Sequence, residues 1–258
     1  MIPLAEQDAI RLKLAQEMLQ PVKIDYFTQR ELDIVVPGRR PCPSCKPTGS
    51  MLRELAALND LISLRVHMFE DDREAVREFG VERIPGIVLR GRSEASLKFY
   101  GMPGGTEFPA FLDSIVDVSR NEVLFSTESV ESLQKIEEDL RIRVFVTPTC
   151  PYCPTMTRAV FQMAMVTPHI KAEVIAANEF PELSQRYNVQ AVPLTVIEDR
   201  VAIPGAVPEK ALVEQVLKAA QSPAARPSEV SGPATPAALP QEPPREGQPL
   251  GGSGLVLP

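Results

Sequence analysis

Hydrophobic and polar positions along this chain follow the same order twice. In the first half, Ile10, Leu14 and Met18 have the spacing of one helix face, and residues 22–27 alternate as in a strand. The same kind of pattern predicts, in order, a helix around 51–58, a strand at 62–69, a short polar helix at 71–79, a hairpin at 86–89 and 97–100, and a helix at 106–118.

The second half repeats this order. Val130, Leu133, Ile136 and Leu140 predict a helix that leads into a strand at 142–146. The pattern continues with a helix opened by Cys150, a strand at 170–175, a helix at 181–187, a hairpin at 194–197 and 201–203, and a helix at 209–220. This order predicts an α/β fold in which each half has a central mixed sheet flanked by helices. We therefore expect one domain over residues 1–120 and a second over 121–221.

Each half contains one Cys-Pro-x-Cys motif, and the two motifs account for all four cysteines. The motifs are Cys42-Pro43-Ser44-Cys45 and Cys150-Pro151-Tyr152-Cys153. An aliphatic-proline pair follows each motif, and its proline lies 43 residues after the first cysteine in both cases. These pairs are Ile84-Pro85 and Val192-Pro193. A repeated dithiol with its own distant proline predicts a duplicated redox domain.

A cysteine at a helix N-terminus is a good nucleophile, because the helix dipole and unpaired backbone N–H groups stabilise its thiolate. We expect Cys150 to attack a substrate disulfide and Cys153, one helical turn further on, to resolve the mixed disulfide. Cys42 and Cys45 have the same expected roles. The strand-turn-helix context is cleaner around Cys150, which predicts that Cys150 is the main nucleophile.

The two distant prolines are expected to shape a substrate groove. A cis bond before a proline presents the preceding backbone, which can pair with an extended peptide. On this hypothesis Ile84 and Val192 hydrogen-bond the substrate, while Pro85 and Pro193 shape the groove. The alternative is that both prolines lie at strand edges without a catalytic role.

Composition narrows the class of protein. The chain has 258 residues, a net charge of -7 and a pI near 5.1, which argue against a nucleic-acid partner. It has no apolar run long enough for a membrane span and no visible signal peptide, so we expect a cytoplasmic protein. In that compartment a C-x-x-C pair is redox-active or binds metal. No histidine lies close to either motif, so we expect no metal and no cofactor besides the redox-active disulfides; His67 and His169 are expected to be structural or exposed.

Two segments fall outside the repeated order. About nine extra residues lie between 30 and 40, before Cys42. From residue 222 to residue 258 the chain is rich in proline, alanine and glycine, a composition that predicts a disordered tail.

Several stretches resemble the protein disulfide oxidoreductase family, glutaredoxin-like proteins of thermophiles with two tandem thioredoxin folds. The resemblance covers about residues 5–220 and is carried by RVFVTPTCPYCP at 143–154, YNVQAVP at 187–193, YGMPGGTEF at 100–108 and IVDVSR at 115–120. It implies thiol-disulfide exchange on protein substrates, including the forming or reshuffling of disulfides, and recycling by a thioredoxin-reductase-like flavoprotein. The cysteine roles and the two cis-prolines carry over by this resemblance. The chain departs from the family in the insertion, in the tail, and in having no carboxylate at 174–177 that could accept a proton near the second dithiol.

Two other functions stay open at this stage. One is a dedicated electron donor to a partner such as a peroxiredoxin. The other is a peptide-binding chaperone with vestigial dithiols. The residues are the same for a reductant, an oxidant and an isomerase, so the sequence leaves the direction of electron flow open.

Overall fold

A computed structural model of the protein describes residues 2–30, 41–93 and 95–221. The insertion predicted between residues 30 and 40 lies outside them except for its first residue, and so does the tail predicted from residue 222. Within the described ranges, no helix combines the length and the apolar character that a membrane crossing requires.

The first half forms the elements that its pattern predicts. In chain order they are α1 (Leu4–Glu17), β1 (Val22–Thr28), α2 (Cys45–Ala56), β2 (Ile62–Met68), α3 (Arg73–Glu78), β3 (Gly86–Arg90), β4 (Ser96–Tyr100) and α4 (Glu107–Arg120). α4 ends at Arg120, and the next residue, Asn121, takes a left-handed conformation with φ 53°.

The second half repeats this series. Its elements are α5 (Thr127–Leu133), β5 (Leu140–Val146), α6 (Cys153–Val166), β6 (Ile170–Ala176), α7 (Pro181–Arg186), β7 (Leu194–Ile197), β8 (Val201–Pro204) and α8 (Glu209–Gln221). The helix predicted through Leu140 is too long, because α5 ends at Leu133. Ile136 and Leu140 are nevertheless buried, since the chain after α5 still packs on the same core.

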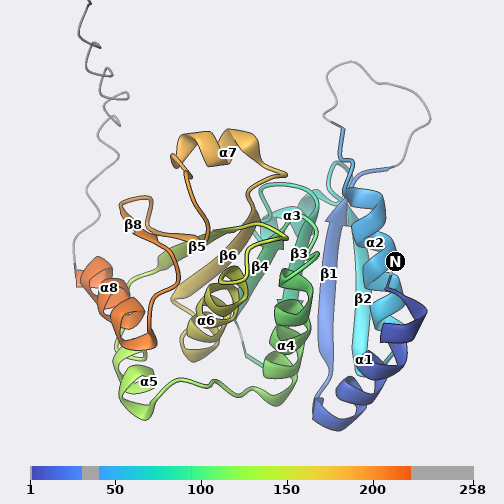
Figure 1. Ribbon diagram of the computed structural model, residues 1–258, viewed down its shortest axis with the longest axis horizontal. Coiled ribbons are helices and arrows are strands. Elements are labelled where there is room, and N and C mark those ends of the chain that lie inside the picture. Colours follow the sequence, from blue (N-terminus) through green and yellow to red (C-terminus); the bar gives the residue numbers. More distant parts are fainter. Residues whose placement is uncertain (1, 31–40, 94, 222–258) are drawn as a thin grey trace, which may run out of the picture. The chain divides into compact units, whose positions relative to one another are not determined.

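All eight strands of the described chain join in one sheet, in the order β2-β1-β3-β4-β6-β5-β7-β8 (Figure 1). In each half the central strand, β1 or β5, has a parallel neighbour on one side and the antiparallel hairpin on the other. The halves meet where β4 pairs with β6 in parallel. The predicted mixed sheet is therefore confirmed, and the sheet is shared by both halves, which form one compact unit.

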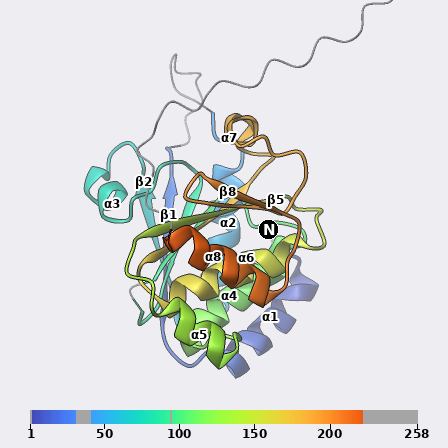
Figure 2. The same ribbon diagram turned by 90° about the vertical axis from the view of Figure 1, so that its left-hand side faces the viewer.

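Helices cover both faces of this sheet. On one face, α1, α2, α4, α5, α6 and α8 pack over a large apolar core, and on the other α3 and α7 cover a smaller one (Figures 1 and 2). Alternate strand residues supply the two cores, as the period of two requires. In β5, for example, Ile142 and Val144 belong to the larger core and Phe145 to the smaller one.

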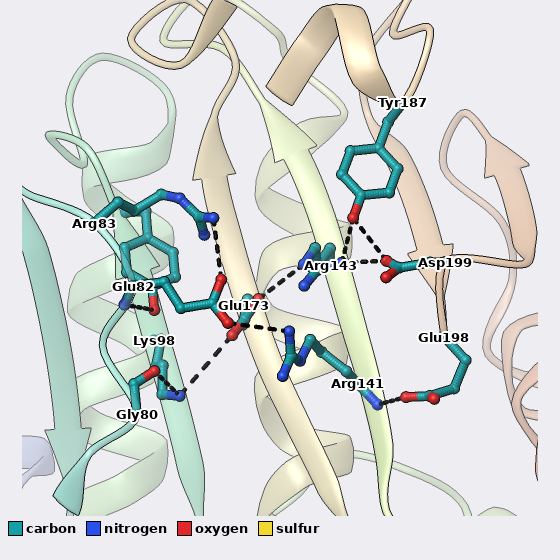
Figure 3. A network of polar contacts seen from close by, with 11 residues as sticks. Gly80, Glu82, Arg83, Lys98, Arg141, Arg143, Glu173, Tyr187, Glu198 and Asp199 are labelled. Atoms are coloured by element: carbon teal, nitrogen blue, oxygen red, sulfur yellow. Dashed lines mark hydrogen bonds and ion pairs between the residues drawn. The ribbon is translucent and has the colours of Figure 1, made fainter. Parts of the chain in front are cut away.

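Where the halves meet, the α3/α7 face of the sheet carries buried charges (Figure 3). Lys98 of β4, Glu173 of β6 and Arg143 of β5 are paired neighbours across three strands. Glu173 accepts a hydrogen bond of 2.9 Å from Arg143 Nε and lies 3.9 Å from Lys98 Nζ. Arg143 also contacts Asp199 and donates to the Tyr187 hydroxyl at 2.5 Å. The charges are mutually compensated, and the network crosses from β4 of the first half to β6 and β5 of the second.

Candidate active sites

Each dithiol lies between a central strand and the helix that follows it. The structure holds Cys42–Cys45 and Cys150–Cys153 as disulfides, with Cα–Cα distances of 5.4 Å and 5.5 Å. The helices begin at Cys45 and Cys153, so the prediction that Cys150 opens its helix is wrong by three residues. Cys150 instead precedes the first turn, and the backbone N–H of Cys153 points toward its sulfur.

The geometry of the second dithiol fits an outer nucleophile and an inner resolving cysteine. Cys153 is fully buried, whereas Cys150 retains 7% exposure. The backbone N–H of Cys153 lies 3.2 Å from Cys150 Sγ. In the reduced protein that N–H is placed to stabilise a Cys150 thiolate. The first dithiol follows the same order, with Cys42 partly exposed and Cys45 buried.

The two predicted prolines lie beside the dithiol ends of the sheet. The peptide bonds Ile84-Pro85 and Val192-Pro193 are both cis, and each proline immediately precedes a hairpin strand, β3 or β7. Val192 O lies 3.6 Å from Cys150 Sγ. The structure therefore brings Val192 and Cys150 together as the sequence predicts, while peptide binding by these residues stays a prediction.

The start of α4, which belongs to the first half, packs against the second dithiol. Thr106 donates from its backbone N–H to Pro148 O at 2.8 Å and from its hydroxyl to Cys150 O at 2.8 Å. Gly105 makes this approach possible, since a Cβ there would lie 2.1 Å from Pro148 O and the residue has φ +58°. The second site is thus built from both halves.

Glu107, the first residue of α4, supplies a buried carboxylate near this site. It is 1% exposed, and its Oε2 accepts a hydrogen bond of 2.7 Å from the hydroxyl of Thr157. Thr157 lies one helical turn after Cys153, on the same face of α6. The other carboxylate oxygen, Oε1, is buried without a hydrogen-bond partner among the described residues.

Burial raises the pKa of the Glu107 carboxyl to about 7, and the hydrogen bond from Thr157 opposes this rise only in part. A buried carboxylate from the first half is therefore hydrogen-bonded to α6, the helix that follows the second dithiol. Sequence reasoning missed Glu107 because an acidic residue in the first turn of a helix is ordinary. Its pairing with Thr157 depends on how α4 and α6 pack together.

At the first dithiol a tyrosine lies close to the inner cysteine. The buried Tyr26 of β1 donates its hydroxyl to Cys45 O at 2.5 Å. In the register of the two halves Val144 of β5 takes the place of Tyr26, so the two sites differ beneath the dithiols.

One histidine lies in the sheet and the other lies just before it. His67 of β2 is buried, with Nε2 2.9 Å from an Asp25 oxygen and its ring stacked on Phe27. His169, in the turn before β6, is half-buried beside Asp139. Within the described residues, no cluster of three or more His, Cys, Asp or Glu side chains has a geometry suited to a metal ion.

Comparisons with known proteins agree with this architecture. A family model described as a thioredoxin domain matches residues 140–218. Among curated proteins, the alkyl hydroperoxide reductase protein AhpF of Xanthomonas campestris pv. phaseoli is 29% identical over 143 residues, which are 55% of this chain and 25% of that protein. The corresponding protein of Pseudomonas putida is 26% identical over 152 residues, which are 58% of this chain and 27% of that protein. The matched region thus spans about a quarter of these relatives.

Solved structures match over most of the described chain. A protein disulfide oxidoreductase from Aeropyrum pernix K1 aligns with a TM-score of 0.76 and 26% identity, covering 85% of this chain and 94% of that one. The NTD_N/C domain of the alkylhydroperoxide reductase AhpF from Enterococcus faecalis aligns with a TM-score of 0.73 and 21% identity, covering 84% and 100%. The predicted thioredoxin-like fold and the resemblance to protein disulfide oxidoreductases are confirmed.

Proposed function

Because the chain is a two-site thioredoxin-fold protein of the redox class, we propose that it exchanges thiols and disulfides with protein substrates. The observation that carries this proposal is the repeated combination of a Cys-Pro-x-Cys disulfide at the start of a helix with a cis X-Pro bond beside the same end of the sheet. At the second site Cys150 Sγ lies 3.6 Å from Val192 O, which puts a backbone edge suited to an extended peptide next to the reacting sulfur.

In the reducing direction the Cys150 thiolate attacks one sulfur of a substrate disulfide. A mixed disulfide forms, and the other substrate sulfur leaves as a thiolate that takes up a proton. Cys153 then loses its proton and attacks Cys150 Sγ, which releases the second substrate thiolate. Two electrons pass from the protein dithiol to the substrate, and the Cys150–Cys153 disulfide is restored. The oxidising direction is the reverse of these steps.

Glu107 accepts the proton of Cys153 in this proposal. A pKa of about 7 lets the carboxyl exchange protons near neutral pH, and its oxygen Oε1 is the acceptor.

Insulin reduction with single-cysteine variants tests the proposal. We expect Cys150→Ser to remove most of the activity, because Cys150 is the main nucleophile, and Cys42→Ser to remove less. If Cys42→Ser abolishes insulin reduction while Cys150→Ser stays near the wild-type rate, the assignment of the main site is wrong. If a variant with all four cysteines replaced by serine keeps full activity as a peptide-binding chaperone and the parent protein reduces nothing, the redox function itself is wrong.

The reduction potentials of the two disulfides decide the direction of electron flow between the protein and its substrates. Each disulfide is equilibrated with glutathione in a variant whose other pair is changed to serine. A potential of about -200 mV or higher favours oxidation or isomerisation, and one of about -270 mV favours reduction.

A second candidate function is electron donation to a peroxidase, and the similarity to the AhpF proteins of alkyl hydroperoxide reductases favours it. In this case a thioredoxin-reductase-like flavoprotein supplies the electrons and a peroxiredoxin receives them. Rates on insulin and on a purified peroxiredoxin separate the two functions.

The proposal also includes a cytoplasmic location and no cofactor beyond the disulfides. A reduction assay in buffer treated with chelator and stripped of flavin tests whether a cofactor is needed.

A further inference from the structure

A carboxylate from the second half contacts the motif of the first dithiol. Glu179 lies in the turn between β6 and α7, and its Oε2 accepts a hydrogen bond from the Ser44 hydroxyl. Its Oε1 accepts a hydrogen bond of 2.8 Å from the backbone N–H of Met102. Ser44 is a residue between Cys42 and Cys45, so the carboxylate is held directly at the active-site turn.

The backbone of the first half is shaped for this contact. Gly101 precedes Met102 with φ +99°, a conformation that favours glycine. A Cβ at this position would lie 2.5 Å from the Ala176 Cβ and 3.0 Å from Glu179 Oε1. The glycine therefore lets the turn after β6 come close enough for Glu179 to reach Ser44.

The second dithiol lacks this arrangement at the matching position. Tyr152 stands where the first motif has Ser44, and its side chain is 67% exposed. The two motifs thus differ in the residue before the inner cysteine: the small serine anchors a carboxylate, whereas the tyrosine projects into solvent.

The charge of Glu179 opposes the reduced form of the first site. Its two hydrogen-bond partners, a hydroxyl and a backbone N–H, are uncharged. Reduction of the Cys42–Cys45 disulfide adds two electrons and creates a thiolate at Cys42, which lies two residues from Ser44. A second negative charge close by destabilises that thiolate, and a less stable reduced form means a lower reduction potential.

We propose that Glu179 is a positioning residue of the first active site, which acts through Ser44 to keep the Cys42–Cys45 pair more reducing than the motif alone would make it. The proposal rests on the proposed function, because it concerns the potential at which the first site exchanges electrons. It assigns to each site a carboxylate from the opposite half: Glu107 for the second and Glu179 for the first.

The test uses the full chain with Cys150 and Cys153 changed to serine, so that only the first site exchanges with glutathione. We expect Glu179→Gln to lower the equilibrium constant for oxidation by glutathione disulfide about fivefold, which corresponds to a rise of about 20 mV in potential. The pH dependence of Cys42 alkylation should shift down by about one pH unit, the lower end of the effect of a close charge because Glu179 is half-buried. Glu214→Gln removes the same charge from an exposed position on α8, and it should change neither the equilibrium constant nor the pH dependence of alkylation.

Ser44→Ala provides a second variant that leaves the charge in place but removes its anchor. It should shift the equilibrium constant in the same direction by a smaller factor, and it should have no further effect in the Glu179→Gln background. The proposal is overturned if Glu179→Gln leaves the equilibrium constant within about 1.5-fold of the parent, or if the two substitutions act additively. These results are distinguishable from a failure of the proposed function, which would appear in the parent protein as a lack of exchange with glutathione and with insulin.

Discussion

Glu107→Gln separates the chemical role of the buried carboxyl from its structural role. The substitution keeps the size of the side chain and an oxygen that can accept the hydrogen bond from Thr157, but it removes the titrating proton. Glu107 is 1% exposed and only one of its two oxygens has a partner among the described residues, so the ionised form is poorly solvated.

The size of the effect on stability follows from the pKa of this carboxyl. Its ordinary value is 4.5, and burial raises it to about 7 in the folded protein. The folded state therefore keeps a proton that the unfolded chain loses, and the free energy of unfolding falls as pH rises from about 4.5 to about 7. Each pH unit in that interval is worth about 1.4 kcal/mol, so the ionised carboxyl costs about 3 kcal/mol above pH 7.

Urea unfolding of the oxidised protein at about pH 4.5 and about pH 8 measures this cost. Glu107→Gln should keep the pH dependence contributed by every other group and lose only the contribution of Glu107. Relative to the wild type it should therefore gain about 3 kcal/mol between the two pH values. Glu128→Gln, at an exposed position in the first turn of α5, is the control and should show no such gain.

Activity should change in the opposite sense. Without its proton acceptor Cys153 resolves the mixed disulfide more slowly, and we expect single-turnover release of substrate at neutral pH to slow by about a hundredfold or more. We therefore expect Glu107→Gln to be more stable than the wild type at high pH and yet to release substrate more slowly. If the stability difference between Glu107→Gln and the wild type is the same at both pH values, the carboxyl does not titrate near neutrality and the reasoning is refuted.

Two further substitutions test how the halves are joined. Glu173→Gln removes the carboxylate that compensates Lys98 in the buried network, and urea unfolding should show a loss of about 3–5 kcal/mol, as for other broken buried ion pairs. Gly105→Ala places a Cβ 2.1 Å from Pro148 O, so it should displace α4 and lower insulin reduction, whereas Gly205→Ala, with φ +76° and no atom within 4 Å, carries only the backbone cost. Equal melting temperatures and activities for the two alanine variants would contradict the role given to Gly105.

Local sequence patterns were sufficient to predict the helices and strands and to identify the reacting cysteines. Period-two alternation places Ile142 and Val144 in the larger core, and the cysteine and proline spacing marks both dithiols and both cis bonds. The errors lie at element boundaries. The end of α5 is one, because Ile136 and Leu140 continue the apolar spacing of a helix although the chain has already turned toward β5.

The residues that could not be predicted are those whose partners come from the other half. Glu107 and Glu179 are separated from Thr157 and Ser44 by 50 and 135 positions, and nothing in their own surroundings in the sequence marks them. Their contacts require the parallel pairing of β4 with β6, which brings the ends of the two half-sheets together. Each half alone has the elements of a complete thioredoxin fold, so local sequence patterns do not predict contacts between the two halves.

The shared sheet therefore has a consequence for how the two sites function. A duplicated domain that stayed independent would carry its own proton acceptor and could be separated without loss. Here the start of α4 contacts Cys150 through Thr106, and the turn after β6 contacts Ser44 through Glu179. Because the carboxylate at each site comes from the opposite half, separating the halves would remove a group from both sites at once. The interface between the halves therefore contacts both dithiol motifs, at Cys150 through Thr106 and at Ser44 through Glu179.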